Sequence, residues 1–456
     1  MLLPETPAAA GTGGQVRIYH FVYAAAQVAD VTVAILAEPD AGDVPPELSV
    51  KRVIRPGIAS SPVAPDAGAK GALSTLLTGF RNNGRKLMLA GQNICVDRSG
   101  QGRQGVFHKI YGWLLLLQAS TLTLIVRLFP IDIHVRGNCW DAIKTELEEL
   151  PEPPDYVWCE HSYLFPLTSV LCKQFPKAKI VINAHNVEWI LKDSIARTKP
   201  AGLARSWTML ESRLIKHWEA RMVAESALIY TCSEEDKQRL QHLEPDSTTG
   251  IIAIPNGVDV SHFVPSDGQT EMPTLLFAGT AGYPPNDDAA YWLSSEIFPA
   301  IRKQISTCRL LLAGRNADQN WRHLHSPDQG IEVISDVPDM RPVLGSAWMS
   351  LVPLRSGSGT RLKIVEAMSS GRCVVSTTIG AEGLNLSPGV DLIIHDNASD
   401  FAEAVCEVIE DTQQRKAFET QGRQVACERF SWQQLSLQAA DEFRSRIELE
   451  ELASAD

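Results

Sequence analysis

The sequence predicts an α/β protein with two doubly wound parallel sheets. Short apolar runs of strand length alternate with runs of helix length over residues 155–254 and again over residues 274–395, which is the pattern of repeated βαβ units. Residues 261–271 lack this alternation and indicate a linker. The chain is therefore expected to contain an N-terminal domain at 1–265, a C-terminal domain at 272–430, and a terminal helix with an acidic tail at 431–456.

Composition argues against several classes of partner. The chain has 456 residues and a formal net charge of −12; nucleic-acid phosphates require a basic face, so nucleic acid is not expected as the main partner. The nine cysteines are scattered, without a CxxC pair or zinc-type spacing, which predicts a reduced, cytoplasmic protein with no metal site. The N-terminus lacks the basic and apolar regions of a secretory leader, and none is expected.

One apolar stretch raises the question of membrane contact. Residues 110–126 read IYGWLLLLQASTLTLIV, a length at the lower limit for a transmembrane helix. The polar residues inside this run and the charges that flank it favour a buried or interfacial helix. Peripheral contact with a membrane surface, and a true span, stay open as alternatives.

The beginning of the N-terminal domain has a weak pattern. Small residues at 4–14 indicate a loop that ends in Gly13 and Gly14, followed by a helix and a buried strand within 17–36. A parallel sheet of this type should start with a strand before the loop. Because only residues 1–3 stand there, this first strand is expected to be missing or short.

A histidine motif follows the strand predicted at 179–183. His185, in the run NAHNVE, therefore lies at the carboxyl end of a strand, where open α/β sheets bind ligands. A lone histidine is more often a core or capping residue, and that alternative stays open. The helical stretch at 191–225 carries an apolar face that is expected to pack internally, formed by Trp207, Leu210, Leu214 and Trp218.

The C-terminal half alternates more cleanly and contains the most informative stretch, PLRSGSGTRLKIVEAMSSG at 353–371. An apolar strand precedes a small-residue loop, and helical spacing begins at Arg361. Free backbone N–H groups and the helix dipole make such a loop an anion site. The helix dipole destabilises Arg361 and Lys363 in the first turn by roughly 0.3–1 kcal/mol each, and a bound phosphate would make the position of both cations favourable. Glu366 then faces hydroxyls beyond the phosphates, unless Lys363 and Glu366 are only a solvated pair.

This stretch, continued by STTIGAEG, resembles the donor-site segment of the GT-B retaining glycosyltransferases of family 4. The runs HNVE at 185–188, IPNGVD at 254–259 and FSW at 430–432 resemble the same family. The resemblance implies two Rossmann-like domains facing a cleft, with the last helix crossing back to the N-terminal domain. It also implies transfer of a hexosyl group, with retention, from a nucleoside diphosphate sugar to a hydroxyl acceptor. UDP- or GDP-sugar is the implied donor, and no metal or other cofactor is implied.

The resemblance also assigns residues to roles. Its catalytic set is His185, Arg361, Lys363 and Glu366. Its donor-binding set adds Gly279, Thr280, Asn286, Arg315, Val337, Ser358, Gly359 and Thr360, and its loop near the acceptor and phosphates contains Gly13 and Gly14. This sequence departs from the family in two places. Thr280 and Asn286 stand where many members have a basic pair, and Ser358 replaces the first of two glutamates, which puts the identity of the sugar in doubt.

Two alternatives to the transferase remain. A nucleotide-sugar epimerase would release free nucleotide and a modified sugar without an acceptor. A non-catalytic nucleotide-sugar binder or scaffold is the alternative from a different class, and the two departures together with the missing first strand favour it somewhat. For a transferase, the acceptor is a glycan, a lipid-linked molecule or a small molecule. The expected location is the cytoplasm, with the inner membrane face as an open possibility.

Overall fold

The computed structural model describes residues 1–9, 13–35, 43–54, 147, 150, 152–357 and 360–455. The apolar run at 110–126, and with it the question of its membrane contact, lies outside these residues. Within the described part, none of the helices combines the length and the apolarity that crossing a membrane requires. The chain forms two compact units, the first made of Met1–Thr6, Val31–Pro46 and Val50–Val181 and the second of Pro7–Asp30, Glu47–Ser49 and Ile182–Asp456.

The first sheet has seven strands in the order β3-β2-β1-β4-β5-β6-β7. Its strands are β1 (Leu2–Leu3), β2 (Thr32–Ile35), β3 (Arg52–Ile54), β4 (Tyr156–Glu160), β5 (Lys179–Asn183), β6 (Leu228–Thr231) and β7 (Gly250–Ala253). The first strand is therefore short but present. Leu2 pairs with Ala34 of β2 and with Cys159 of β4, both in parallel register, and Leu2 and Leu3 are buried.

Helix α1 (Gly13–Ala26) begins earlier than the sequence predicts. Gly13 and Gly14 form its first turn, so they do not end a loop. Glycine is a poor helix former, which hid this start in the sequence. The helix is held instead by burial of an apolar face that includes Ile18, Phe21 and Val22.

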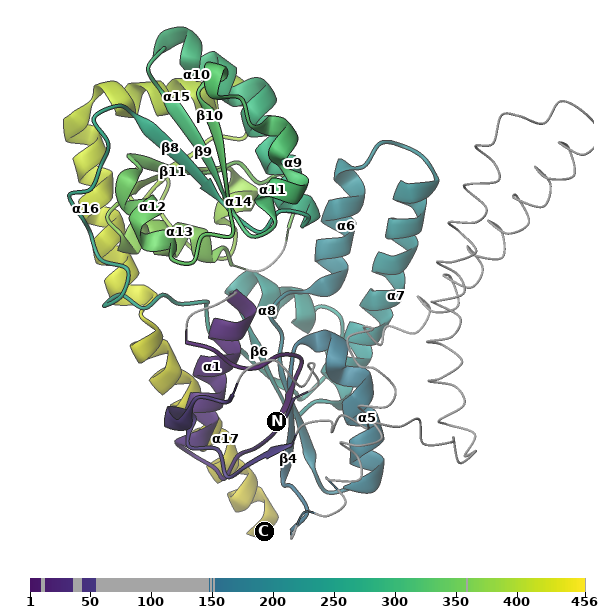
Figure 1. Ribbon diagram of the computed structural model, residues 1–456. Helices are drawn as coiled ribbons and strands as arrows, with labels where there is room; N and C mark the ends of the chain where they lie inside the picture. Colours follow the sequence, from purple (N-terminus) through teal and green to yellow (C-terminus); the bar gives the residue numbers. More distant parts are fainter. Residues whose placement is uncertain are drawn as a thin grey trace, which may run out of the picture. The chain divides into compact units, whose positions relative to one another are not determined.

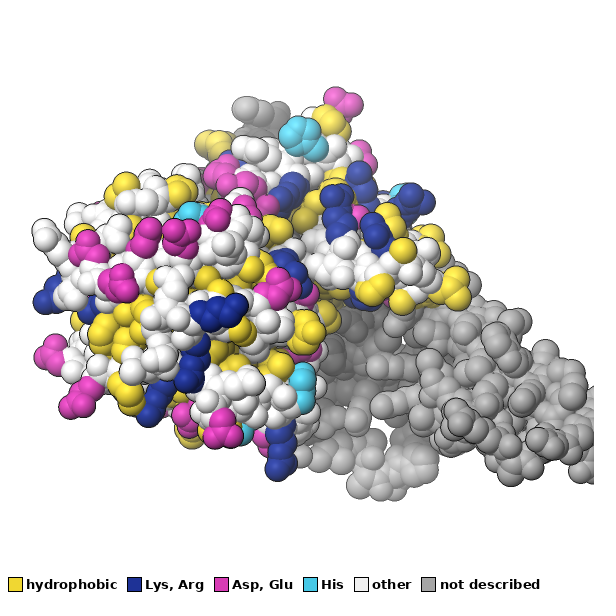
Figure 2. Space-filling view, turned by 90° about the horizontal axis from the view of Figure 1, so that it is seen from above, with side chains coloured by type: hydrophobic (Ala, Val, Ile, Leu, Met, Phe, Trp, Pro, Cys, Tyr) yellow, Lys and Arg dark blue, Asp and Glu magenta, His cyan; other side chains and the backbone are white. Residues whose placement is uncertain are grey.

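Four further helices accompany β4–β7: α5 (Phe165–Gln174), α6 (Glu188–Thr198), α7 (Leu203–Glu225) and α8 (Glu234–Gln241). Helices α6 and α7 lie side by side (Figure 1). The surface over this pair carries both basic and hydrophobic side chains (Figure 2). At α8, Ser233 is the N-cap, and its side chain accepts a hydrogen bond from the Asp236 N–H at 3.0 Å.

The second sheet has six strands in the order β10-β9-β8-β11-β12-β13, and each strand pairs in parallel with its neighbours. They are β8 (Thr274–Ala278), β9 (Arg309–Gly314), β10 (Ile331–Ser335), β11 (Met349–Val352), β12 (Cys373–Ser376) and β13 (Ile393–Ile394). The main helices are α9 (Pro284–Trp292), α10 (Phe298–Gln304), α12 (Met340–Ser346), α13 (Leu362–Ser369), α15 (Ala398–Glu410) and α16 (Thr412–Arg429), with the short α11 (Ala317–Asn320) and α14 (Thr378–Ala381). Two parallel sheets covered by helices (Figure 1) confirm the predicted α/β class.

The helical segment from Pro284 to Gln304 is divided in the structure. Helix α9 ends at Trp292, a π-helical turn covers Leu293–Ile297, and α10 starts at Phe298. Pro299 stands at the start of α10. Because proline has no N–H, the wider turn before it accommodates the missing hydrogen bond.

The last helix, α17 (Trp432–Ala455), packs along α1. The His20 ring stacks on Trp432 with centroids 4.4 Å apart, and its Nδ1 lies 3.0 Å from the Ser436 hydroxyl. The Tyr230 hydroxyl on β6 donates to the Ala439 carbonyl at 3.2 Å. These contacts fix the start of α17 beside the first turns of α1.

Candidate active site

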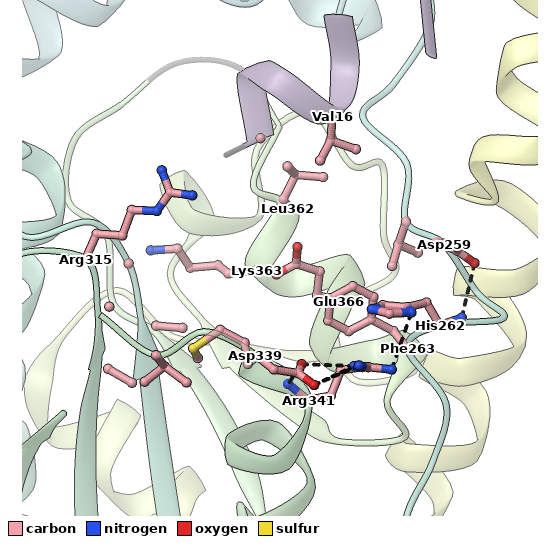
Figure 3. A pocket seen from close by; sticks show the side chains of 18 of the residues that line it. Val16, Asp259, His262, Phe263, Arg315, Asp339, Arg341, Leu362, Lys363 and Glu366 are labelled. Atoms are coloured by element: carbon pink, nitrogen blue, oxygen red, sulfur yellow. Dashed lines mark hydrogen bonds and ion pairs between the residues drawn. The ribbon is translucent and has the colours of Figure 1, made fainter. Parts of the chain in front are cut away.

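A cavity of about 730 Å³ lies at the carboxyl ends of strands β8 and β9 in the second unit (Figure 3). Ala278 and Gly279 end one strand, and Ala313 and Gly314 end the other. Its other walls come from the start of α1, the segment after β7, the segment after β10, the start of α13 and Trp432. Parallel sheets bind ligands at this edge because loops and helix starts meet there.

Two glycines form the floor of the cavity by close approach of their backbones. A Cβ on Gly314 would lie 1.7 Å from the Gly279 carbonyl oxygen, and a Cβ on Gly279 would lie 2.8 Å from the Asn286 side chain. The Gly279 N–H donates to the Ala313 carbonyl at 2.9 Å. Only residues without a side chain allow the strand ends to converge this closely.

Lys363 contributes a held cation to this cavity. Its Nζ donates to Asn286 Oδ1 at 2.9 Å and lies 4.5 Å from the centroid of the Phe277 ring. The Asn286 amide is itself fixed, because its Nδ2 donates to the Thr280 carbonyl at 2.9 Å. Burial, and then the charge of Arg361, lower the pKa of Lys363 to about 7. Asn286 is thus a positioning residue for Lys363: it is buried and is not among the residues lining the cavity.

Glu366 lies one helical turn after Lys363 and also lines the cavity. Burial raises the pKa of Glu366 to about 7, although the charge of Lys363 acts in the opposite direction. The pKa values of both groups are therefore shifted towards neutrality. Such matched, shifted groups in a concave site are typical of binding and catalysis.

Arg315 adds a second cation. It directly follows Gly314, lines the cavity and is exposed. Figure 3 shows its guanidinium on the same side of the cavity as the Lys363 ammonium. None of the hydrogen bonds or ion pairs found in the described residues engages its side chain. The predicted residues Gly13, Gly279, Thr280, Arg315, Val337, Lys363 and Glu366 all line this one cavity.

The other predicted residues lie elsewhere. His185 is 7% exposed, and its carbonyl accepts from the Cys232 thiol at 3.2 Å. Arg361 is half-buried, and its guanidinium lies against Gly357. Burial lowers the pKa of Arg361. The residues that line the described cavity do not include Gly14, His185, Asn286, Thr360 or Arg361, and Ser358 and Gly359 lie outside the described residues.

Sequence reasoning missed the wall opposite Lys363 and Arg315. Arg341 donates to Asp339 through Nε at 2.9 Å and Nη2 at 2.7 Å, and its Nη1 lies 3.4 Å from His262 Nδ1. Asp259 accepts from the Ser261 and His262 N–H groups. Asp259 was predicted only as part of the run IPNGVD, and no residue of this wall after Val337 was predicted. The capping pattern of Asp339 before α12 was the one available signal.

A buried arginine ties the start of α1 to the first sheet. Arg17 is 0% exposed and donates to Asn183 Oδ1 at 3.0 Å, to Asn256 Oδ1 at 3.1 Å, and to the carbonyls of Ile254 at 2.8 Å and Thr231 at 3.3 Å. It therefore joins Gly13 and Val16 at the cavity to the ends of β5, β6 and β7. A single arginine in an apolar helix gave no sign of this role.

A buried carboxyl group holds the segment after His185. Glu219 of α7 is 4% exposed and accepts from the backbone N–H groups of Glu188 at 2.8 Å and Trp189 at 3.1 Å. It thus caps α6 from outside the helix. Further along α6, the Ser194 hydroxyl accepts from the Gly357 N–H at 3.0 Å. Helix α6 therefore links the histidine motif to the loop before Arg361.

Comparison with known proteins gives this geometry a context. Residues 272–411 match the family glycosyl transferases group 1. The matched segment contains β8, β9, α13 and every cavity residue from Ala278 to Glu366. A Klebsiella pneumoniae relative, described as an uncharacterized 44.6 kDa protein in the cps region, is 22% identical over 304 residues, which are 65% of this chain and 74% of that protein.

Two solved structures extend the likeness beyond this group 1 segment. Sucrose-phosphate synthase from Thermosynechococcus elongatus aligns with a TM-score of 0.62 at 14% identity, over 99% of this chain and 96% of that chain. HepE from Anabaena, in complex with UDP and glucose, aligns with a TM-score of 0.58 at 11% identity, over 97% and 98%. These alignments confirm the expected GT-B fold with two Rossmann-like domains.

Proposed function

We propose that the protein is a retaining glycosyltransferase that moves a hexosyl group from a nucleoside diphosphate sugar to a hydroxyl acceptor. The observation that carries the proposal is the cavity itself. Lys363 and Arg315 share one end of it, Glu366 follows Lys363 along α13, and the segment that builds most of it matches group 1 glycosyltransferases.

The two cations fit the diphosphate. Departure of a nucleoside diphosphate needs its growing negative charge to be met by fixed donors and cations. Lys363, held by Asn286 and the Phe277 ring, and Arg315 provide that charge. A bound phosphate raises the pKa of Lys363, so the ammonium stays protonated during turnover. The proposed reaction therefore uses side-chain cations and needs no metal.

The remaining roles follow the same arrangement. Glu366 accepts hydrogen bonds from ribose hydroxyls, and Val337 contacts the base through its backbone. Ser358, Gly359, Thr360 and Arg361 are proposed to contact the phosphates. His185 faces the donor sugar once the ligand is bound, with Glu219 holding its segment in place. Gly13 and Gly14, at the start of α1, lie on the acceptor side.

UDP is the first donor nucleotide to test and GDP the second, because the HepE structure contains UDP. The acceptor is proposed to be a sugar hydroxyl on a glycan, with lipid-linked and small acceptors as the variants to compare. The enzyme is proposed to act in the cytoplasm.

The proposal is tested by a thermal-shift panel of UDP, GDP, ADP, TDP and their hexose conjugates, followed by donor turnover with and without acceptor sugars. A ligand at a hundredfold excess over its Kd stabilises the fold by about 2.7 kcal/mol. Acceptor-dependent release of one nucleotide supports the transferase. Release of nucleotide and a modified sugar without acceptor indicates an epimerase, whereas selective binding without turnover indicates a binder. No shift with any ligand contradicts all three.

A further inference from the structure

Helix α7 buries its polar side. Thr208, Ser212 and Glu219 are each 4% exposed. Ser212 donates to the Trp189 carbonyl at 2.9 Å, and Glu219 caps α6 through two N–H groups. Hydrogen bonds therefore hold this side of α7, and Met222 and Val223 are buried near the end of the helix.

An apolar stripe lies on the opposite side of α7. Leu203 is 91% exposed and Leu210 is 40% exposed. Seven residues make about two helical turns, so these two leucines share one face, while Thr208 and Ser212 lie on the other. Of the four residues predicted to pack internally, Trp207, Leu214 and Trp218 are half-buried, and only Leu210 is exposed. An exposed leucine pair at the end of a long helix pair is instead typical of an interaction surface.

Positive charge surrounds these leucines. Residues 197–216 contain five bases, at Arg197, Lys199, Arg205, Arg213 and Lys216, and one acid, Glu211, for a net charge of +4 in a chain whose total is −12. Arg197 pairs with Asp193 at 2.8 Å, and Lys199 donates to Thr208. Figure 2 shows basic and hydrophobic side chains gathered over α6 and α7. The rest of the chain is acidic and would be repelled by an anionic surface. The charge distribution therefore favours the orientation in which these leucines face such a surface.

We propose that this α6–α7 tip, defined by Arg197, Lys199, Leu203, Arg205, Leu210 and Arg213, docks on the anionic surface of a lipid bilayer. Arginine and lysine attract anionic headgroups, and exposed leucines enter the boundary between headgroups and acyl chains. A nucleic acid would satisfy the bases but would offer nothing to Leu203. The inference concerns a surface outside the cavity, and it does not depend on the proposed transferase activity.

The experiment is co-sedimentation of the full chain with vesicles. One set contains phosphatidylcholine alone, and the other contains equal parts of phosphatidylcholine and phosphatidylglycerol. The wild type should bind the anionic vesicles, bind neutral vesicles far less, and lose binding as salt rises. Replacing both leucines, Leu203→Ser with Leu210→Ser, should lower the partition coefficient about tenfold or more. Replacing two bases, Arg205→Gln with Arg213→Gln, should lower it about 30-fold.

Matched substitutions serve as controls at exposed positions away from the tip. Leu437→Ser on α17, where Leu437 is 55% exposed, and Arg322→Gln should leave binding unchanged. Circular dichroism and the melting temperature check that each variant is folded. Absence of wild-type binding to anionic vesicles would overturn the proposal. So would equal binding by the tip variants, or a leucine variant that changes only the oligomeric mass, because that result indicates a protein partner.

Discussion

The affinity of the cavity for a nucleoside diphosphate should fall as pH rises above 7, and Lys363 should be the cause. In the empty cavity the pKa of Lys363 is lowered to about 7, first by burial and then by Arg361. A diphosphate binds the protonated form and raises this pKa. The affinity for the diphosphate is therefore highest below pH 7, and it falls with increasing pH until the pKa of Lys363 in the bound form is passed. For a bound-form pKa above 9, the Kd rises about 50-fold from pH 7 to pH 9.

The matched perturbation is Lys363→Met, which keeps the length of the side chain and removes its charge. A hydrogen bond to a charged group contributes ~1.5–3 kcal/mol, so the Kd of UDP at pH 7 should rise about 10- to 100-fold. The variant should also lose most of its pH dependence over this range, because Arg315 stays charged. Lys303→Met, at an exposed position in the last turn of α10, is the control and should behave as the wild type.

Isothermal titration calorimetry with UDP, or with whichever diphosphate the thermal-shift panel selects, measures both effects. The range from pH 7 to 9 lies above the second ionisation of the phosphate, near pH 6, so the ligand charge is constant. Glu366 is controlled by repeating the series in Glu366→Gln, because its pKa is also about 7. A wild-type Kd that is flat across this range would refute the assignment, as would the same slope in Lys363→Met.

Three further predictions concern the supports of the site. Asn286→Ala should weaken diphosphate binding about tenfold, whereas Asn286→Asp should move the loss of affinity to higher pH because it places a negative charge beside Lys363. Calorimetry over the same pH series measures both effects. An unchanged pH profile for Asn286→Asp would exclude a positioning role for Asn286. Glu219 has a pKa raised to about 8 by burial and then by the charge of Glu188, so its stabilising contribution is complete below the unfolded pKa near 4.5 and is lost as pH rises towards 8. Urea unfolding should therefore show Glu219→Gln gaining stability relative to the wild type between pH 5 and pH 8, and a constant difference would contradict this. Gly314→Ala should lower stability by about 1–3 kcal/mol and abolish nucleotide binding, because its Cβ would meet the Gly279 carbonyl, while Gly250→Ala, with contacts no shorter than 3.4 Å, should do neither.

The positions of the C-terminal strands along the chain were predictable because each strand is a short apolar run and helices separate most of them. Gly279, Arg315 and Val337 were assigned through the family resemblance. The sheet explains why they lie together, because each follows a strand and parallel strands end at one edge. Lys363 and Glu366 followed from a glycine-rich loop before a helix. The first strand was harder, because a two-residue strand carries no periodicity, and its pairing with β2 and β4 is what forms it.

The contacts that hold the site were not predictable, because they join distant residues. Asn286 and Lys363 are 77 positions apart, and Arg17 reaches Ile254 across 237 positions. A sequence pattern shows on which face of its helix a polar residue lies, but it does not show which distant carbonyl or amide group forms a hydrogen bond with that residue. The same limit explains why the hydrogen bond between Lys363 and Asn286, and the contacts of Glu219 and Arg341, were not predicted.

The central claim is that a nucleoside diphosphate occupies the cavity between the ends of β8 and β9 and the start of α13. Hydrogen–deuterium exchange with and without saturating UDP tests it most directly. Exchange should slow in peptides covering Gly279–Thr280, Gly314–Arg315 and Leu362–Glu366, and it should be unchanged in the α6–α7 tip. Protection confined to other segments, despite demonstrated binding, would contradict the account.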